Sequence, residues 1–195
     1  MLNKTWTAEE ILCEEHFKKR TARDDAGRYI VRLLRRESQG RLGESCEQAK
    51  RRFHQLERRF QEHPDLHQAY SEFTQEYEEL GHMNQINEEA SNAEERHYLP
   101  HHAAFKSPSS STRTRVVFDG SCPSNGLTLN DKLLVGPTIQ QELYSIVLRF
   151  RTYQTAFTAG IAKMYRQGRI HQDVRNLQRI LWRRSAEEPL RTYEL

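Results

Sequence analysis

The chain has 195 residues, of which 36% are hydrophobic and 29% charged, and its formal net charge is +3 at pH 7. This length suits one domain, or one domain with a helical extension, and a mean hydropathy of −0.90 allows only a thin core. No apolar run approaches the roughly 20 residues of a membrane-spanning helix, and residues 1–17 mix charges into every apolar patch. We therefore expect an intracellular, cytoplasmic protein with no membrane partner.

The three cysteines are far apart and odd in number, which is typical of reduced thiols. A zinc site is an alternative reading, although the paired C-x-x-C or H-x-x-x-H spacing of such sites is missing. Its ligands would be Cys122, His97, His101 and His102.

The first 97 residues are predicted to be mainly helical. Thr7 to Glu10 form a capping-box sequence that starts a helix, and residues 28–34 favour a short strand. A second capping-box sequence, Ser45 to Gln48, starts an amphipathic helix that Pro64 ends, and Pro64 also starts another helix that closes at Gly81. Residues 82–96 are expected to be a linker or a frayed helix.

The two helices of residues 45–81 should form a hairpin with one apolar side. Aromatic and aliphatic residues recur along them at intervals of three and four, which indicates packing in a core rather than a binding face. These residues are Ala49, Phe53, Leu56, Phe60, Leu66, Tyr70, Phe73, Tyr77 and Leu80.

From residue 98 the pattern changes to strands. Residues 98–106 and 114–119 predict a β-hairpin with a polar loop, and 124–126 predict a turn. A helix after Thr138 should point its apolar residues inward, and a strand over 154–159, a helical turn over 171–175 and a strand over 177–182 should follow. The inward residues would be Ile139, Leu143, Ile146, Val147 and Phe150. Helices followed by strands fit an α+β fold.

Charge is divided unevenly along the chain. Residues 112–184 hold twelve Lys or Arg against four Asp or Glu, a balance of +8, so the remainder carries −5. A basic block of this kind suggests a polyanion partner, most simply nucleic acid. An ordinary solvated surface is the alternative.

Several ordered blocks resemble a known family. The run Thr158 to Gln167, read with 115–120, 129–138, 98–102 and 178–182, is similar to the fingers-to-palm junction of a reverse transcriptase, and most of all to the polymerase segment of BEL/Pao-type LTR retrotransposons. The resemblance covers nearly the whole chain. It implies a helical connector with a short strand over residues 1–97, followed by the fingers and a partial palm over 98–195.

The resemblance also assigns the site. Nucleotide transfer by this family uses two Mg²⁺ ions held by carboxylates, but Gly160 stands where the first aspartate is expected, and no Y-x-D-D sequence occurs. The backbone carbonyl of Ile161 falls at a metal-ligand position and Tyr165 at the steric gate that excludes a ribose 2′-hydroxyl. Lys106 and Arg115 match the cations that grip the triphosphate of the dNTP. Asp119 also matches a family position, although a turn-capping role before Gly120 is simpler.

These observations predict an inactive polymerase fragment that binds no Mg²⁺ itself. We expect weak, non-specific binding of an RNA or DNA template-primer through Arg149 and Arg151, and an apolar sheet edge near Phe157 and Ile180 where later palm strands are missing. Two rivals are a catalytically dead nucleic-acid-binding module and a helical interaction scaffold formed by the hairpin of residues 45–81.

Overall fold

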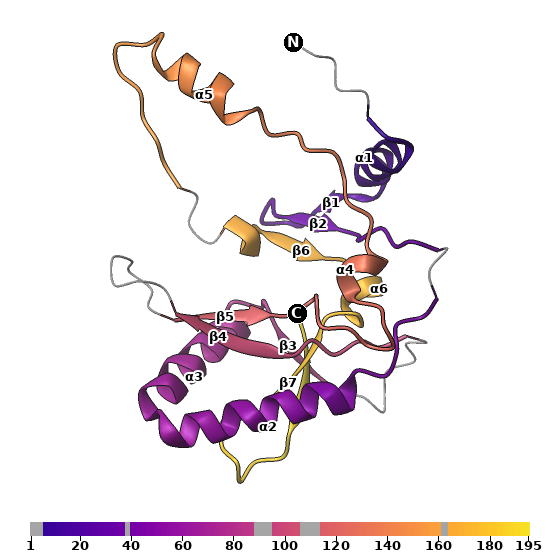
Figure 1. The fold of residues 1–195 in the computed structure, drawn as a ribbon, viewed down its shortest axis with the longest axis vertical. Helices are drawn as coiled ribbons and strands as arrows, with labels where there is room; N and C mark the ends of the chain where they lie inside the picture. The colour runs from indigo at the N-terminus through magenta and orange to yellow at the C-terminus, as the bar shows by residue number, and fades with distance from the viewer. Residues whose placement is uncertain (1–5, 38–39, 88–94, 106–113, 161–163) are drawn as a thin grey trace. The chain divides into compact units, whose positions relative to one another are not determined.

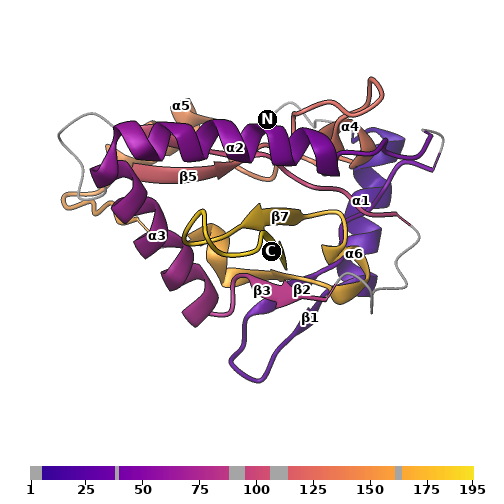
Figure 2. The same ribbon diagram turned by 90° about the horizontal axis from the view of Figure 1, so that it is seen from below.

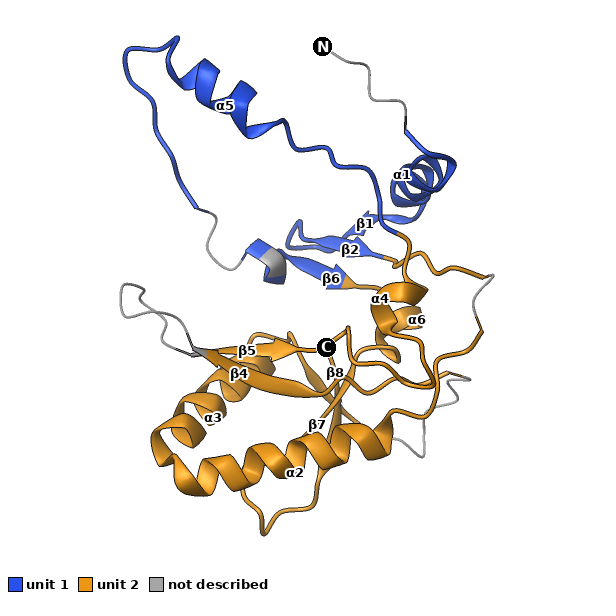
Figure 3. Ribbon diagram, in the orientation of Figure 1, with its two compact units in different colours: residues 1–31, 135–169 blue, residues 32–134, 170–195 orange. Residues whose placement is uncertain are grey.

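The structure of the protein is a computed structural model, and it describes residues 6–37, 40–87, 95–105, 114–160 and 164–195. Two compact units divide the chain: unit 1 combines residues 1–31 with 135–169, and unit 2 combines 32–134 with 170–195 (Figure 3). The boundary predicted between residues 97 and 98 is not a boundary between these units, because helices before it pack on strands after it.

Unit 1 begins with helix α1 (Ala8–Arg20), and its predicted capping box is confirmed. The Thr7 hydroxyl accepts from the Glu10 N–H at 3.2 Å, and the Glu10 carboxylate accepts from the Thr7 N–H at 2.8 Å, which satisfies two N–H groups at the helix start. Strands β1 (Ala22–Arg23), β2 (Tyr29–Val31) and β6 (Gly168–Ile170) form a small sheet in the order β1-β2-β6. The strand predicted over 28–34 is therefore shorter than expected.

Unit 1 also contains helix α5 (Leu143–Phe150), and here two predictions are wrong. Four of the five residues expected to face inward are exposed, among them Ile139 at 82%, Leu143 at 74% and Val147 at 47%, and the fifth, Ile146, is half-buried. The strand expected over 154–159 does not form, and Phe157 is 87% exposed. A strand needs a neighbour that supplies hydrogen bonds, and within the described part of unit 1 the only sheet is β1-β2-β6.

Unit 2 combines a helical hairpin with two small sheets (Figure 1). Its helices are α2 (Cys46–Glu62), α3 (Pro64–Glu79), α4 (Leu129–Lys132) and α6 (Gln172–Arg175). Strands β4 (His101–Phe105) and β5 (Thr114–Phe118) pair antiparallel and confirm the predicted hairpin, as α6 confirms the predicted helical turn. The second sheet has the order β3-β8-β7, formed by β3 (Asn84–Ile86), β8 (Arg191–Glu194) and β7 (Arg179–Trp182). Strand β3 lies in the stretch predicted as a linker, and no strand was predicted at β8.

The core of unit 2 lies between the helical hairpin and these strands. Figure 2 shows α2 and α3 meeting at a corner, and α2 contacts β4 and β7 while α3 contacts β5. Phe53 is 2% exposed and Tyr70 fully buried, and both rings pack on Trp182, with ring centroids 5.8 and 5.3 Å away. The packing role predicted for the aromatic side of the hairpin is confirmed. Gly81 follows α3 with a φ of 66°, a left-handed conformation that favours glycine after a helix.

The second predicted capping box is wrong. Ser45 has helical backbone angles and makes no side-chain cap to α2. Its hydroxyl instead accepts from the buried backbone N–H of Tyr98 at 2.7 Å. A buried N–H without an acceptor costs about 1–3 kcal/mol of folding free energy, whereas the N–H groups at an exposed helix end can donate to water. The Ser45 hydroxyl therefore stabilises the protein more by accepting from the Tyr98 N–H than by capping α2.

The expected apolar sheet edge is also wrong for Ile180. This residue is fully buried in β7, which pairs with β8 on one side, and its neighbour Arg179 forms a parallel bridge to Tyr98 on the other. Phe157 belongs to unit 1 and to no strand.

Candidate functional site

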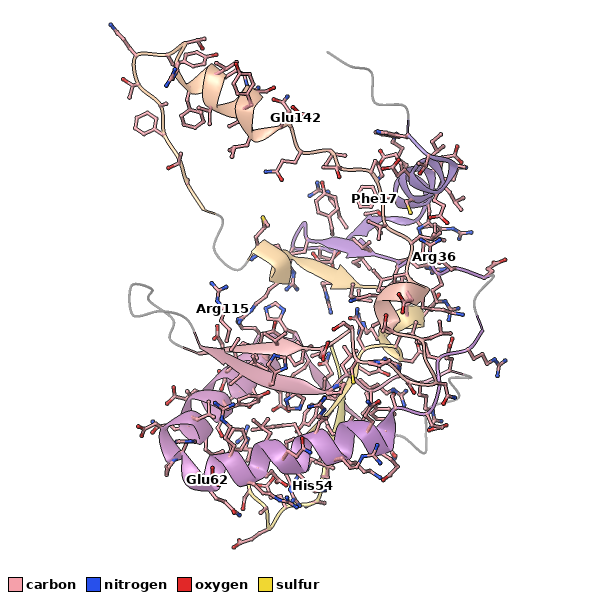
Figure 4. All side chains as sticks on the ribbon, viewed as in Figure 1. Phe17, Arg36, His54, Glu62, Arg115 and Glu142 are labelled. Carbon is pink, nitrogen blue, oxygen red and sulfur yellow. The ribbon has the colours of Figure 1, made fainter. Side chains whose placement is uncertain are left out.

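The residues assigned by the family resemblance are divided between the two units. Arg115 lies in unit 2, exposed on β5 next to the end of the β4–β5 hairpin (Figure 4). Gly160 and Tyr165 belong to unit 1, where Tyr165 lies in a 3₁₀ helix, Met164–Gln167. Lys106 and Ile161 lie outside the described residues. Arg115 and Tyr165, for which the resemblance implies contacts to a nucleotide, therefore belong to different units.

The residues around Gly160 do not fit the Mg²⁺ that the family would use. Magnesium is held by carboxylate oxygens, and the sequence has no Asp or Glu between Glu142 and Asp173. A Cβ built on Gly160 would have no heavy atom within 4 Å, so an aspartate would fit there sterically. The segment around Gly160 therefore has room for an aspartate but contains no carboxylate that could bind Mg²⁺.

The zinc alternative has no support in the described residues, where no group of three or more His, Cys, Asp or Glu side chains is arranged to hold a metal. His101 is engaged at both ring nitrogens. Its Nε2–H donates to the Leu181 carbonyl at 2.8 Å, so Nδ1 must accept the hydroxyl proton of Tyr70, with which it also forms a hydrogen bond.

The Tyr70–His101 pair has the most strongly shifted pKa values of unit 2. Burial lowers the pKa of His101 to about 4 and raises that of Tyr70. Such shifts mark many active sites. Here both side chains lie in the core, against Phe53 and Trp182, so we infer that the pair stabilises the fold and is not part of an active site.

Unit 1 contains a hollow that joins one arginine, Arg149, with aromatic side chains, and we call it the aromatic hollow. It has a volume of about 290 Å³ and lies where α5 ends and the extended segment after it begins. Tyr153 is 69% exposed and Phe157 87% exposed, and Arg149 lies in the same lining. The described residues of the lining are Ile146, Arg149, Phe150, Tyr153, Thr155, Ala156 and Phe157.

The sequence analysis found Arg149 and Arg151 but missed the aromatic partners. The signal was present in Arg149-Phe150-Arg151-Thr152-Tyr153, where cations and aromatic rings alternate. Helical periodicity instead predicts an inward Phe150, and the family resemblance places Phe157 near an apolar sheet edge. In the structure, Arg149, Arg151, Tyr153 and Phe157 are all exposed to solvent.

The hollow is suited to a flat, negatively charged ligand. Exposed aromatic faces stack with bases whatever their identity, and arginine binds phosphate through its forked N–H groups. The described residues that line the hollow include no carboxylate, so none of them opposes an anion.

No protein-family model matches the chain, and no curated protein or solved structure is significantly similar to it. No helix in the described ranges has the length and apolar character needed to cross a membrane.

Proposed function

We propose that this chain is a fragment of a BEL/Pao-type reverse transcriptase that has no polymerase activity and binds single-stranded RNA or DNA weakly and without sequence preference. The ancestry rests on the ordered sequence blocks, from the Tyr98 block to the Trp182 block. The binding rests on one observation, which is the aromatic hollow of unit 1.

Two physical terms would contribute to the binding. Stacking of a base on an aromatic side chain is worth about 1–3 kcal/mol and does not depend on which base is present. Each phosphate contacted by a cation releases condensed counterions, so affinity should fall steeply with salt. Arg149 and Arg151 would supply the cations, and Tyr153 and Phe157 the rings.

The absence of polymerase activity follows from chemistry. In-line transfer between a primer and a dNTP requires carboxylates that hold two metal ions, and Gly160 provides none. The chain also has no Y-x-D-D sequence to supply the others. Restoring one aspartate would therefore not restore the reaction.

The helical-scaffold alternative is less well supported. It needs an apolar face of the 45–81 hairpin that a partner could contact. Phe53, Phe60 and Tyr70 on that face are at most 7% exposed, because they pack on the strands of unit 2.

Fluorescence anisotropy with labelled dT₂₀, dC₂₀ and rU₂₀ tests the binding. We expect similar affinities for all three and a steep loss of affinity between 50 and 200 mM salt. Tyr153→Ala with Phe157→Ala should weaken binding about tenfold or more at every salt concentration. Arg149→Gln with Arg151→Gln should weaken it and also reduce the salt slope by about two.

Arg51→Gln with Arg58→Gln is the matched control, because both arginines are exposed on α2 in the other unit. Binding that depends on sequence, or that the control pair weakens as much as the pair in unit 1, would refute the proposal. Primer extension on an RNA template should show no incorporation by the unmodified chain or by Gly160→Asp. Incorporation by the unmodified chain would overturn the interpretation of Gly160.

A further inference from the structure

The two walls of the aromatic hollow come from neighbouring segments of unit 1. Ile146, Arg149 and Phe150 lie in one wall, and because they are three and four residues apart they share one face of the last turns of α5. Tyr153 and Phe157 lie in the other wall, on the chain that follows the helix. The described lining of the hollow is therefore a local feature of residues 146–157.

Hydrogen bonds at the end of α5 fix the direction in which the chain continues. The Arg151 N–H donates to the Leu148 carbonyl at 3.1 Å. The hydroxyl and the N–H of Thr152 both donate to the Arg149 carbonyl, at 2.7 and 3.1 Å. These bonds satisfy carbonyls that the last turn of a helix leaves without an intrahelical partner. They place Tyr153, the start of the second wall, directly after the closed helix end.

The hollow is small, and its rings are open to a ligand. Its volume of about 290 Å³ is at the lower end of the range of about 300–1,000 Å³ that small-molecule sites occupy. Phe150 is 38% exposed, Tyr153 69% and Phe157 87%, so three rings offer surface to the same small space. A hollow of this size suits one flat base and not a row of stacked bases.

The two arginines at the end of α5 are directed to different sides of the helix. Positions two apart on a helix do not face each other, and Arg151 keeps helical backbone angles as the residue that ends α5. In agreement with this, Arg149 lines the hollow, whereas Arg151 is not among its described lining residues. In the part of the chain that the structure describes, neither guanidinium is paired with a carboxylate. Each arginine is therefore suited to a phosphate of its own.

Acidic side chains are remote from the hollow in the sequence. The nearest are Glu142, which precedes α5 at its opposite end (Figure 4), and Asp173, which belongs to unit 2. The carbonyl end of the helix itself carries partial negative charge. A phosphate is therefore favoured at the arginine side chains, and the uncharged base on the rings.

We propose that the aromatic hollow holds one unpaired base, that Arg149 contacts one phosphate beside that base, and that Arg151 contacts a different phosphate of the same strand. A base in a duplex is paired and stacked on its neighbours, so it does not present a free face to the rings. This inference rests on the proposed nucleic-acid binding and adds to it the number of bases bound and the role of each arginine.

Fluorescence anisotropy with oligonucleotides that carry few bases tests the number of bases on the unmodified protein. The ligands are labelled decamers of abasic residues with no thymine, one central thymine or two adjacent central thymines. The first thymine should strengthen binding about fivefold or more, because it supplies the stacked base. The second should add about twofold at most, since it only offers a second place to bind, whereas a second stacked base would again add about fivefold or more.

The outcomes separate this inference from the proposed function. A gain of about fivefold or more from the second thymine would overturn the one-base site. If Tyr153→Ala with Phe157→Ala still weakens binding of dT₂₀ in that case, the proposed nucleic-acid binding stands. No gain from the first thymine would also overturn the inference, and absence of any binding to dT₂₀ would overturn both.

Uncharged methylphosphonate linkages, placed one at a time in the decamer with one thymine, test the arginines. Replacing one linkage beside the thymine should weaken binding to the parent about threefold, but should hardly affect Arg149→Gln, which has already lost that contact. The same should hold for Arg151→Gln at a different linkage. Arg20→Gln is the matched control, because Arg20 is an exposed arginine at the end of α1 in the same unit, and it should stay as sensitive as the parent.

Two results would overturn the assignment of the phosphates. One is that Arg149→Gln and Arg151→Gln become insensitive at the same linkage. The other is that Arg149→Gln stays as sensitive as Arg20→Gln at every linkage.

Discussion

The buried imidazole of His101 should make the stability of unit 2 depend on pH. Burial lowers its pKa from 6.5 in the unfolded chain to about 4 in the folded protein, so the fold favours the neutral ring. The stabilisation is fully present above pH 6.5 and is lost as the pH falls toward 4. At about 1.36 kcal/mol for each unit of pKa, the full loss is about 3 kcal/mol.

The structure gives the physical reason for this value. Protonation would place a proton on Nδ1, which accepts from Tyr70, while Nε2 already donates to the Leu181 carbonyl. The tyrosine hydroxyl would then have to rotate away, inside a core where the rings of Phe53 and Trp182 pack against the imidazole.

Urea unfolding at several pH values between 7 and 4 measures the effect. Trp182 is 2% exposed in the same core and reports the unfolding of unit 2, once Trp6→Phe has removed the other tryptophan. Other groups titrate in this range, so the quantity of interest is the difference from His101→Gln, which keeps a donor and an acceptor but does not titrate. The variant should lose about 3 kcal/mol less than the parent between pH 6.5 and 4.

His102→Gln is the matched control, because it removes an exposed imidazole from the neighbouring position on β4. The charge of His102 contributes least among the causes that shift the pKa of His101, so this variant should change the pH dependence only slightly. If His101→Gln retains the full pH dependence of the parent chain, the buried imidazole is not the group that titrates, and the argument fails.

Three further predictions concern packing. Phe53→Ala should lower the free energy of unfolding of unit 2 by about 3–5 kcal/mol in urea, because it opens a cavity beside Trp182; a loss below 1 kcal/mol would contradict its core role. His97→Leu should leave stability unchanged or higher, because both ring nitrogens are buried without a partner in the described ranges; a loss above about 2 kcal/mol would contradict this. The exposed apolar residues of α5 should make the chain self-associate in sedimentation velocity, and Leu143→Glu with Val147→Lys should lower the association constant; an association constant that this variant leaves unchanged would contradict the prediction.

The helices and the long hairpin were predictable from the sequence because their signals are local. A capping box provides hydrogen bonds for the N–H groups at a helix start from side chains within four residues, as Thr7 and Glu10 do. Apolar residues at intervals of three and four give a helix one apolar side, which packs in the core. The same holds for the β4–β5 hairpin, whose strands are separated by one loop and pair with each other. In these elements the residues that stabilise the structure are close in sequence.

The candidate site was predictable only in part. The charge excess and the position of Arg149 and Arg151 were evident in the sequence, and so was the missing carboxylate at Gly160. The exposure of Tyr153 and Phe157 was not, because periodicity describes which residues share a face and not whether another layer covers that face.

Tertiary structure alone decided the remaining features. The apolar run at 154–159 looks like a strand, but a strand forms only with a neighbour to pair with. Ser45 begins a capping-box sequence, yet its hydroxyl accepts a hydrogen bond from the buried Tyr98 N–H and does not cap the helix. A hollow of unit 2 has described lining residues at 32–37, 41, 95, 132, 172–174, 176, 179 and 194, which no local pattern connects. The sequence by itself determined the elements whose hydrogen bonds close within a few residues, and the fold determined every feature whose partner lies far along the chain.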